Sequence, residues 1–115
     1  MAEKYLRDLR ALMSRVSPRL PGRTVLEFKH FFGGAAVYAD GRICITLTPV
    51  GLALKLPEES QRKLTADGAT PLRYFPKGPI KKQYVVVPRS FLEDESRLKP
   101  WAEESIRYAG ALGGP

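Results

Sequence analysis

The segment from Phe31 to Gly41 constrains the fold of this chain more than any other part of the sequence. It places two adjacent glycines, Gly33 and Gly34, between aromatic and β-prone residues, and it closes on the pair Asp40-Gly41. Glycine costs stability inside a strand, so the glycine pair predicts a bulge, a sharp bend or a close approach of two backbones. Asp-Gly between two apolar runs is a strong hairpin signal, because both residues tolerate positive φ. The segment therefore predicts a bent β-hairpin.

Helices are expected before and after the strands. Apolar residues from Ala2 to Val16 recur at the spacing of one helical face, and Ser17-Pro18 ends this pattern. Pro57 suits a first helical turn and predicts a short helix to about Ala66. A closing helix is indicated by a stripe formed by Leu98, Trp101, Ala102, Ser105, Ala109 and Leu112.

The remaining segments are typical of strands. We expect strands at Arg23–Phe31, Ala35–Tyr38, Arg42–Leu47, Leu52–Leu56, Leu72–Phe75 and Gln83–Val87. In the third of these, Ile43, Ile45 and Leu47 alternate with Cys44 and Thr46, which predicts one buried face. The order of elements predicts a two-layer α+β fold: an antiparallel sheet, built from a meander and a hairpin, on which N-terminal, middle and C-terminal helices pack.

Composition limits the class of protein. The chain has 115 residues, enough for a single domain over residues 1–115, and 43% hydrophobic with 27% charged residues is typical of a folded globular protein. It contains no apolar run of the roughly 20 residues that a membrane span needs, and its first residues lack the apolar core of a signal peptide. Cys44 is the single cysteine, which agrees with a reducing compartment, so we expect a cytoplasmic protein.

Several motifs, taken in order, resemble the TfoX N-terminal domain family, the small domain of the TfoX/Sxy competence regulators and of stand-alone relatives. The resemblance runs from about Phe28 to Ala109. The residues that carry it are Phe32, Gly33, Gly34, Tyr38, Asp40, Gly41, the strand Leu52-Ala53-Leu54-Lys55, Gly68, Tyr74, Tyr84, Val87, Pro88, Trp101 and Ala109. Six such elements in the right order are more specific than any one of them.

The resemblance implies an α/β two-layer fold with one sheet face partly open, and a regulatory background without catalytic residues to carry over. Lys29-His30-Phe31 departs from the Arg-x-Met-like lead of the family, and Ala53 stands where an aromatic residue is common. TfoX regulators also carry a second, C-terminal domain, whereas this sequence ends at Pro115. The competence role is therefore not transferred, and the marked residues are expected to be structural.

The strongest candidate for a binding site is the segment 73–84, expected to be a hairpin loop. It holds four cations, Arg73, Lys77, Lys81 and Lys82, with Tyr74, Phe75 and Tyr84 beside them. Cations bind phosphates and exposed aromatic rings stack on bases, so the loop is a candidate for weakly specific nucleic-acid binding. A net charge of +7 agrees with such a partner, although solvated surface turns have the same composition.

Other chemistry has less support in the sequence. His30 has no nearby set of metal ligands, and Glu27 is three residues away, on the other face of a strand. Cys44 has only Arg42 near it as an activating group, so a structural thiol is the favoured interpretation. The carboxylates at 93–95 and 103–104 are interpreted as helix-end and surface charges, not as a catalytic pair. No metal and no cofactor are predicted.

These observations favour a non-catalytic regulatory or protein-interaction module, whose partner is another protein connected with transcription. Nucleic-acid binding through the segment 73–84 is the second hypothesis. A third hypothesis is a small-molecule binder or enzyme near Gly33-Gly34 and Tyr38. The glycine pair leads into a strand instead of a helix N-terminus, which weighs against a phosphate-binding loop. The sequence predicts no oligomeric state.

Overall fold

A computed structural model describes residues 2–31 and 33–112 of the chain. Phe32, one of the residues that carried the family resemblance, lies outside the described residues. The helices are α1 (Ala2–Val16), α2 (Glu58–Ala66) and α3 (Glu95–Leu112), with a 3₁₀ helix η1 (Arg89–Glu93). The strands are β1 (Leu26–Phe31), β2 (Gly34–Ala39), β3 (Arg42–Thr48), β4 (Gly51–Lys55), β5 (Thr70–Pro71) and β6 (Tyr84–Val86).

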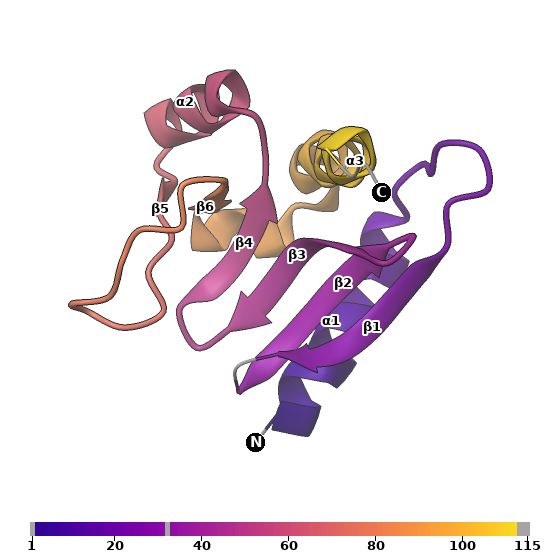
Figure 1. Cartoon of the computed structure of the whole chain (residues 1–115), viewed down its shortest axis with the longest axis horizontal. Coiled ribbons are helices and arrows are strands. Elements are labelled where there is room, and N and C mark those ends of the chain that lie inside the picture. Colours follow the sequence, from indigo (N-terminus) through magenta and orange to yellow (C-terminus); the bar gives the residue numbers. More distant parts are fainter. Residues whose placement is uncertain (1, 32, 113–115) are drawn as a thin grey trace.

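The strands form one antiparallel sheet in the order β1-β2-β3-β4-β6-β5, so the predicted α+β class is confirmed. Helix α1 contacts β1, β2 and β3, and α3 contacts β2, β3 and β4. Figure 1 shows α1 passing behind β1 and β2, while the sheet face toward the viewer carries no helix. The fold is therefore a sheet with α1 and α3 on one face and an opposite face that the helices leave open.

The core lies between this sheet and the two long helices. The predicted apolar stripe of α1 is buried, with Leu9, Leu12, Met13 and Val16 in the core cluster. Helix α3 contributes Leu98, Ala102, Ile106 and Ala109, and the strands contribute Val37, Ile45, Leu54 and Val85. Trp101 is half-buried and packs against this cluster. Among the described residues, no helix is both long and apolar enough to cross a membrane.

Gly34 lies where two backbones come into close contact, which is one of the three alternatives that the sequence left open. A Cβ atom added to Gly34 would lie 2.3 Å from the carbonyl oxygen of Leu47 and 2.9 Å from Cα of Thr48. Gly33 precedes it with φ of +74° and open space around it. Gly33 therefore supplies the bend, and Gly34 allows β2 to pass next to the end of β3.

The Asp-Gly turn between β2 and β3 is also confirmed. Asp40 has φ of 50° and Gly41 has φ of 82°, the pair of positive angles that a tight two-residue hairpin turn needs. The Asp40 carboxylate accepts a hydrogen bond from the backbone N–H of Val25 at 2.9 Å, and the Asp40 N–H donates to the Val25 carbonyl oxygen at 2.9 Å. Asp40 thus fixes both the turn and the approach to β1.

One expectation about β3 is wrong, because the strand contains an irregularity. Val37 pairs with Ile45 and Tyr38 pairs with Ile43, so Cys44 is an extra residue between the two pairs. Ile45 faces the core, whereas Ile43 is shifted to the open face opposite Tyr38. Cys44, expected on a mixed face, is fully buried in the core cluster.

The segment after α2 also differs from the expectation. The predicted strand Leu72–Phe75 is not formed; the pairing with β6 is confined to β5, at Thr70 and Pro71. The 3₁₀ helix η1 was not predicted, and it begins directly after Pro88. Helix α3 begins at Glu95, ahead of Pro100, and the Asp94 carboxylate accepts a hydrogen bond from the backbone N–H of Arg97 at 3.2 Å.

Candidate interaction surface

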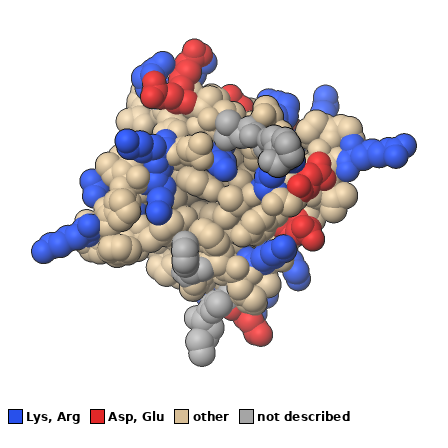
Figure 2. Space-filling view, viewed as in Figure 1, with Lys and Arg blue, Asp and Glu red and all other residues tan. Residues whose placement is uncertain are grey.

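The loop between β5 and β6, residues 72–83, brings together the four cations that the sequence singled out. Arg73, Lys77, Lys81 and Lys82 all belong to it, and all four are exposed. Figure 1 shows this loop extending beyond the sheet, on the left of the view. Figure 2 shows Lys and Arg side chains gathered over the same part of the molecule. We call residues 72–83 the basic loop.

Hydrogen bonds within the basic loop give it a defined shape. The N–H of Lys81 donates to the carbonyl oxygen of Leu72 at 2.9 Å and closes the base of the loop, where Leu72 is fully buried. The N–H of Gly78 donates to the carbonyl oxygen of Phe75 at 2.8 Å. The Arg73 guanidinium donates to the carbonyl oxygen of Gly78 at 2.8 Å, so this predicted ligand also holds the loop in place.

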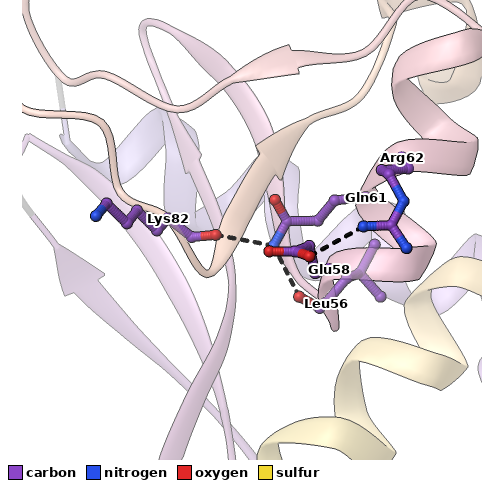
Figure 3. A network of polar contacts seen from close by, with 5 residues as sticks. All are labelled: Leu56, Glu58, Gln61, Arg62 and Lys82. Atoms are coloured by element: carbon purple, nitrogen blue, oxygen red, sulfur yellow. Dashed lines mark hydrogen bonds and ion pairs between the residues drawn. The ribbon is translucent and has the colours of Figure 1, made fainter.

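Gln61 of α2 anchors the second half of the basic loop. Its side-chain amide donates to the carbonyl oxygen of Lys82 at 2.9 Å and to that of Leu56 at 2.8 Å (Figure 3). Figure 3 also shows the Lys82 side chain extending away from these bonds. The backbone of Lys82 is thus fixed while its ammonium group stays available. Nothing in the sequence indicates this contact, which joins residues 21 positions apart.

Replacing Gln61 with alanine is expected to loosen the basic loop. Two backbone carbonyls would lose a donor, and hydrogen-exchange protection of the Lys81 and Tyr84 amides should fall by roughly tenfold, the equivalent of one ordinary hydrogen bond. Arg62→Ala is the matched control on the same helix, because its ion pair with Glu58 is exposed to solvent. Equal protection in the two variants would contradict the anchoring role.

Apolar side chains are exposed among the cations of the basic loop. Phe75 is 59% exposed and Ile80 is 42% exposed. The Phe75 ring lies over Gly78, where an added Cβ would be 2.9 Å from the ring, so the ring has a defined position. Tyr74, Phe75, Pro79 and Lys81 line a shallow hollow of about 480 Å³ beside it. The basic loop therefore presents two exposed apolar side chains among its cations.

Tyr74 and Tyr84 are packed on the open face of the sheet and are less accessible than Phe75. Tyr74 is half-buried, and its ring contacts Phe31 edge-on with 6.0 Å between centroids. Tyr84 is half-buried beneath Lys55, whose Nζ lies 5.8 Å from the ring centroid. Burial raises the pKa of both tyrosines above their ordinary value. Among the three aromatic candidates of the segment 73–84, Phe75 is the one that a partner can reach most easily.

Cys44 is not placed to act as a nucleophile. It is fully buried, its thiol lies 3.5 Å from the carbonyl oxygen of Val37, and burial raises its pKa from 9.0 to about 12. A nucleophilic cysteine needs a lowered pKa and access to substrate. His30 is exposed on β1, where it pairs with Ala35. Within residues 2–31 and 33–112, no three His, Cys, Asp or Glu side chains are grouped so that they could hold a metal ion.

The Cys44 thiol is expected to resist modification while the protein is folded. At pH 8 a disulfide reagent such as DTNB should not label the folded protein. The thiol should react only in molecules that unfold, so the rate of unfolding limits the rate of labelling. The Cys44 thiol keeps its proton to higher pH in the folded state than in the unfolded state, because burial raises its pKa. Ionisation of the thiol therefore favours the unfolded state, and the free energy of unfolding should fall as pH rises above about 9. Rapid, stoichiometric labelling of the native protein at pH 8 would contradict the buried position.

The sequence interpretation placed the carboxylates at 103–104 on the surface as free charges, and the structure differs. Glu104 accepts a hydrogen bond from the hydroxyl of buried Ser60 at 2.7 Å, which joins α3 to α2. Glu103 accepts a hydrogen bond from the backbone N–H of Arg19 at 2.6 Å. Both carboxylates therefore join segments that are distant in the sequence, and nothing in the sequence indicates these contacts.

Comparison with known proteins adds one finding. The family model for the TfoX N-terminal domain matches residues 20–109. The matched region spans the whole sheet, the basic loop and most of α3. No curated protein sequence matches the chain.

Proposed function

The chain belongs to the TfoX N-terminal domain family, and from this premise we propose that it is a non-catalytic interaction module that binds another protein through the basic loop. The observation that carries the proposal is the ordered tip at Phe75 and Ile80, exposed among four cations. Protein interfaces concentrate their binding energy in a few buried aromatic and arginine side chains surrounded by a polar rim. The proposed partner is a protein with an apolar pocket bordered by acidic residues. We also propose that the partner protein is connected with transcription.

The physical properties of the loop support this function. Its internal hydrogen bonds and the Gln61 anchor reduce the ordering that binding would require, and a pre-ordered loop loses less entropy on association. The lysines are flexible point charges that steer an acidic partner and raise the association rate more than the affinity. The apolar tip is therefore expected to supply most of the affinity.

A second candidate function is binding of nucleic acid by the same loop, favoured by the exposed lysines Lys77, Lys81 and Lys82. The two functions respond differently to salt. Binding through phosphates weakens steeply as salt rises, with a slope that depends on the number of phosphate contacts. The affinity of binding through an apolar tip should change little between about 0.1 and 0.3 M salt. At these salt concentrations the screening length is already about 10 Å or less, so charge interactions are weak at the lower concentration too.

The test measures binding of the purified protein to single-stranded and duplex oligonucleotides over this salt range, beside capture of proteins from nuclease-treated lysate of the native host. Lys81→Ala with Lys82→Ala is the diagnostic variant in both assays. We expect a captured protein that persists after nuclease treatment and is retained when salt rises. Oligonucleotide binding whose salt slope falls in the double variant, without a captured protein, would reject the protein partner in favour of nucleic acid.

A further inference from the structure

A groove with a volume of about 740 Å³ runs along α1, and none of its lining residues belongs to the basic loop. One wall is a stripe of α1 formed by Lys4, Tyr5, Asp8, Ala11, Leu12 and Arg15. The opposite side is formed by the β3–β4 turn, residues 48–52, and by η1 with Arg89 and Leu92. The groove exists because α1 packs on β1 to β3 while η1 packs beside β4, which leaves a gap between the two helices at this end of the sheet.

The groove is long. Lys4 and Arg15 are eleven residues apart on α1, and a rise of 1.5 Å per residue puts their backbones about 16 Å apart. The lining positions of α1 recur at helical spacing, so they form one continuous wall of about three turns. The shape suits a rod of similar length lying beside α1.

The floor of the groove is apolar and accessible. Leu47 of β3 and Leu92 of η1 are half-buried, although both pack against the core cluster. Leu12 and Leu52 also line the groove and are buried, whereas 38% of the surface of Val50 is exposed. This surface would be removed from water by a partner that presents its own apolar side chains.

The rim is cationic on both sides. Lys4 and Arg15 border the groove on α1, Arg89 borders it on η1, and Asp8 is the acidic residue among the lining positions. The ion pairs between described residues are Arg62–Glu58 and Arg97–Asp67, so these three cations have no carboxylate partner within residues 2–31 and 33–112. Unpaired cations on both rims favour a ligand that carries acidic groups along both of its edges.

We infer that this groove binds an amphipathic helix of about three turns, with apolar side chains on one face and acidic side chains along both flanks. A helix about 10 Å across, laid with its apolar face in a groove, is an established mode of peptide recognition. A small molecule fits less well, because such ligands bury most of their surface in an enclosed cleft, and this groove is only half enclosed. The inference does not depend on the basic loop and gives the chain a second, separate binding surface.

The probe is a synthetic 15-residue helical peptide with leucines along one face and glutamates on both flanks. Titrated into the ¹⁵N-labelled protein, it should shift amide signals in residues 48–52 and 89–92 and leave the basic loop unchanged. Arg15→Glu with Arg89→Glu should weaken binding by about tenfold, since two attractive pairs become repulsive. Arg7→Glu is the matched control, because Arg7 is exposed on α1 outside the groove and should leave the affinity unchanged.

A second peptide, with lysines in place of the glutamates, tests the charge requirement and should bind at least about tenfold more weakly. Equal affinity for the two peptides would overturn the inference, as would signal shifts confined to other surfaces. Laurate serves as the small-molecule arm: saturable laurate binding in the groove without peptide binding would also overturn it. Thermal unfolding of each variant establishes that the charge changes leave the fold intact.

Discussion

Replacing Gly34 with alanine is expected to destabilise the fold by about 3 kcal/mol or more and to lower the melting temperature by about 10–20 °C. The added methyl group would lie 2.3 Å from a backbone oxygen and 2.9 Å from a backbone Cα, both belonging to β3. Backbone atoms in a paired strand cannot rotate away as the end of a long side chain can. The strands β2 and β3 would therefore have to separate at this point.

Two glycines provide controls for this prediction. Gly33→Ala meets no steric obstacle but must adopt φ of +74°, so it should cost only about 1–2 kcal/mol. Gly110→Ala in α3 has open space around it, and it should stabilise the protein by up to about 1 kcal/mol through helix propensity. The expected order of melting temperatures is Gly110→Ala above the native protein, then Gly33→Ala, then Gly34→Ala. A Gly34→Ala variant that melts within about 2 °C of the native protein would contradict the close approach.

Replacing both Phe75 and Ile80 with serine is expected to weaken binding of the proposed protein partner by at least about thirtyfold. The two side chains are the exposed apolar groups at the tip of the basic loop, and an aromatic anchor of this kind costs about 2 kcal/mol or more when it is removed. Both substitutions lie at the surface, so the melting temperature should change little. Isothermal calorimetry with the captured partner measures the effect.

Charge reversal on the same loop separates the partner classes. With a protein partner, Lys77→Glu and Lys82→Glu should mainly slow association, by about tenfold at low salt, and the effect should shrink as salt rises. With a nucleic-acid partner, the same changes should remove most of the affinity and flatten its salt dependence. Loss of affinity in the charge variant alone, with no effect of Phe75→Ser and Ile80→Ser, would reject the apolar tip as the main contact.

Local chemistry made much of the fold predictable. Helix α1 has the bounds expected from its apolar spacing, and Asp40-Gly41 forms the expected turn because few other residue pairs tolerate two positive φ angles. From the sequence, Gly34 was expected to lie at a bend, at a bulge or at a close approach of two backbones. The position of the β3 backbone shows that it lies at a close approach. Such features depend on a few neighbouring residues, which is why the sequence reveals them.

Features that depend on distant contacts were not predictable. The extra residue at Cys44 moves Ile43 from the buried face to the open face, and only the pairing with β2 reveals this shift. Leu72–Phe75 has β-prone residues, but Pro71 lacks an N–H to continue the pairing, and the chain turns away into the basic loop. Helix α3 starts at Glu95, where Asp94 makes a capping contact. The sequence left this start open, because Pro100 is typical of a first helical turn.

The candidate site was predictable in composition and not in geometry. The four cations and the aromatic residues near them are evident from the sequence, but the sequence does not distinguish the exposed Phe75 from the packed Tyr74 and Tyr84. The sequence only weakly indicates that Ile80 is part of the site, because it is an apolar residue between Pro79 and Lys81. Gln61 has none, because its role depends on a hydrogen bond across 21 residues.

The most direct test of the central claim is photo-crosslinking from position 75 in living cells of the native host. A photoreactive amino acid in place of Phe75 should yield a discrete protein adduct that survives nuclease treatment. The same group in place of Thr65, which is exposed on α2, should yield no such adduct. An adduct at position 75 that nuclease removes, or identical adducts at both positions, would contradict a protein-binding function of the basic loop.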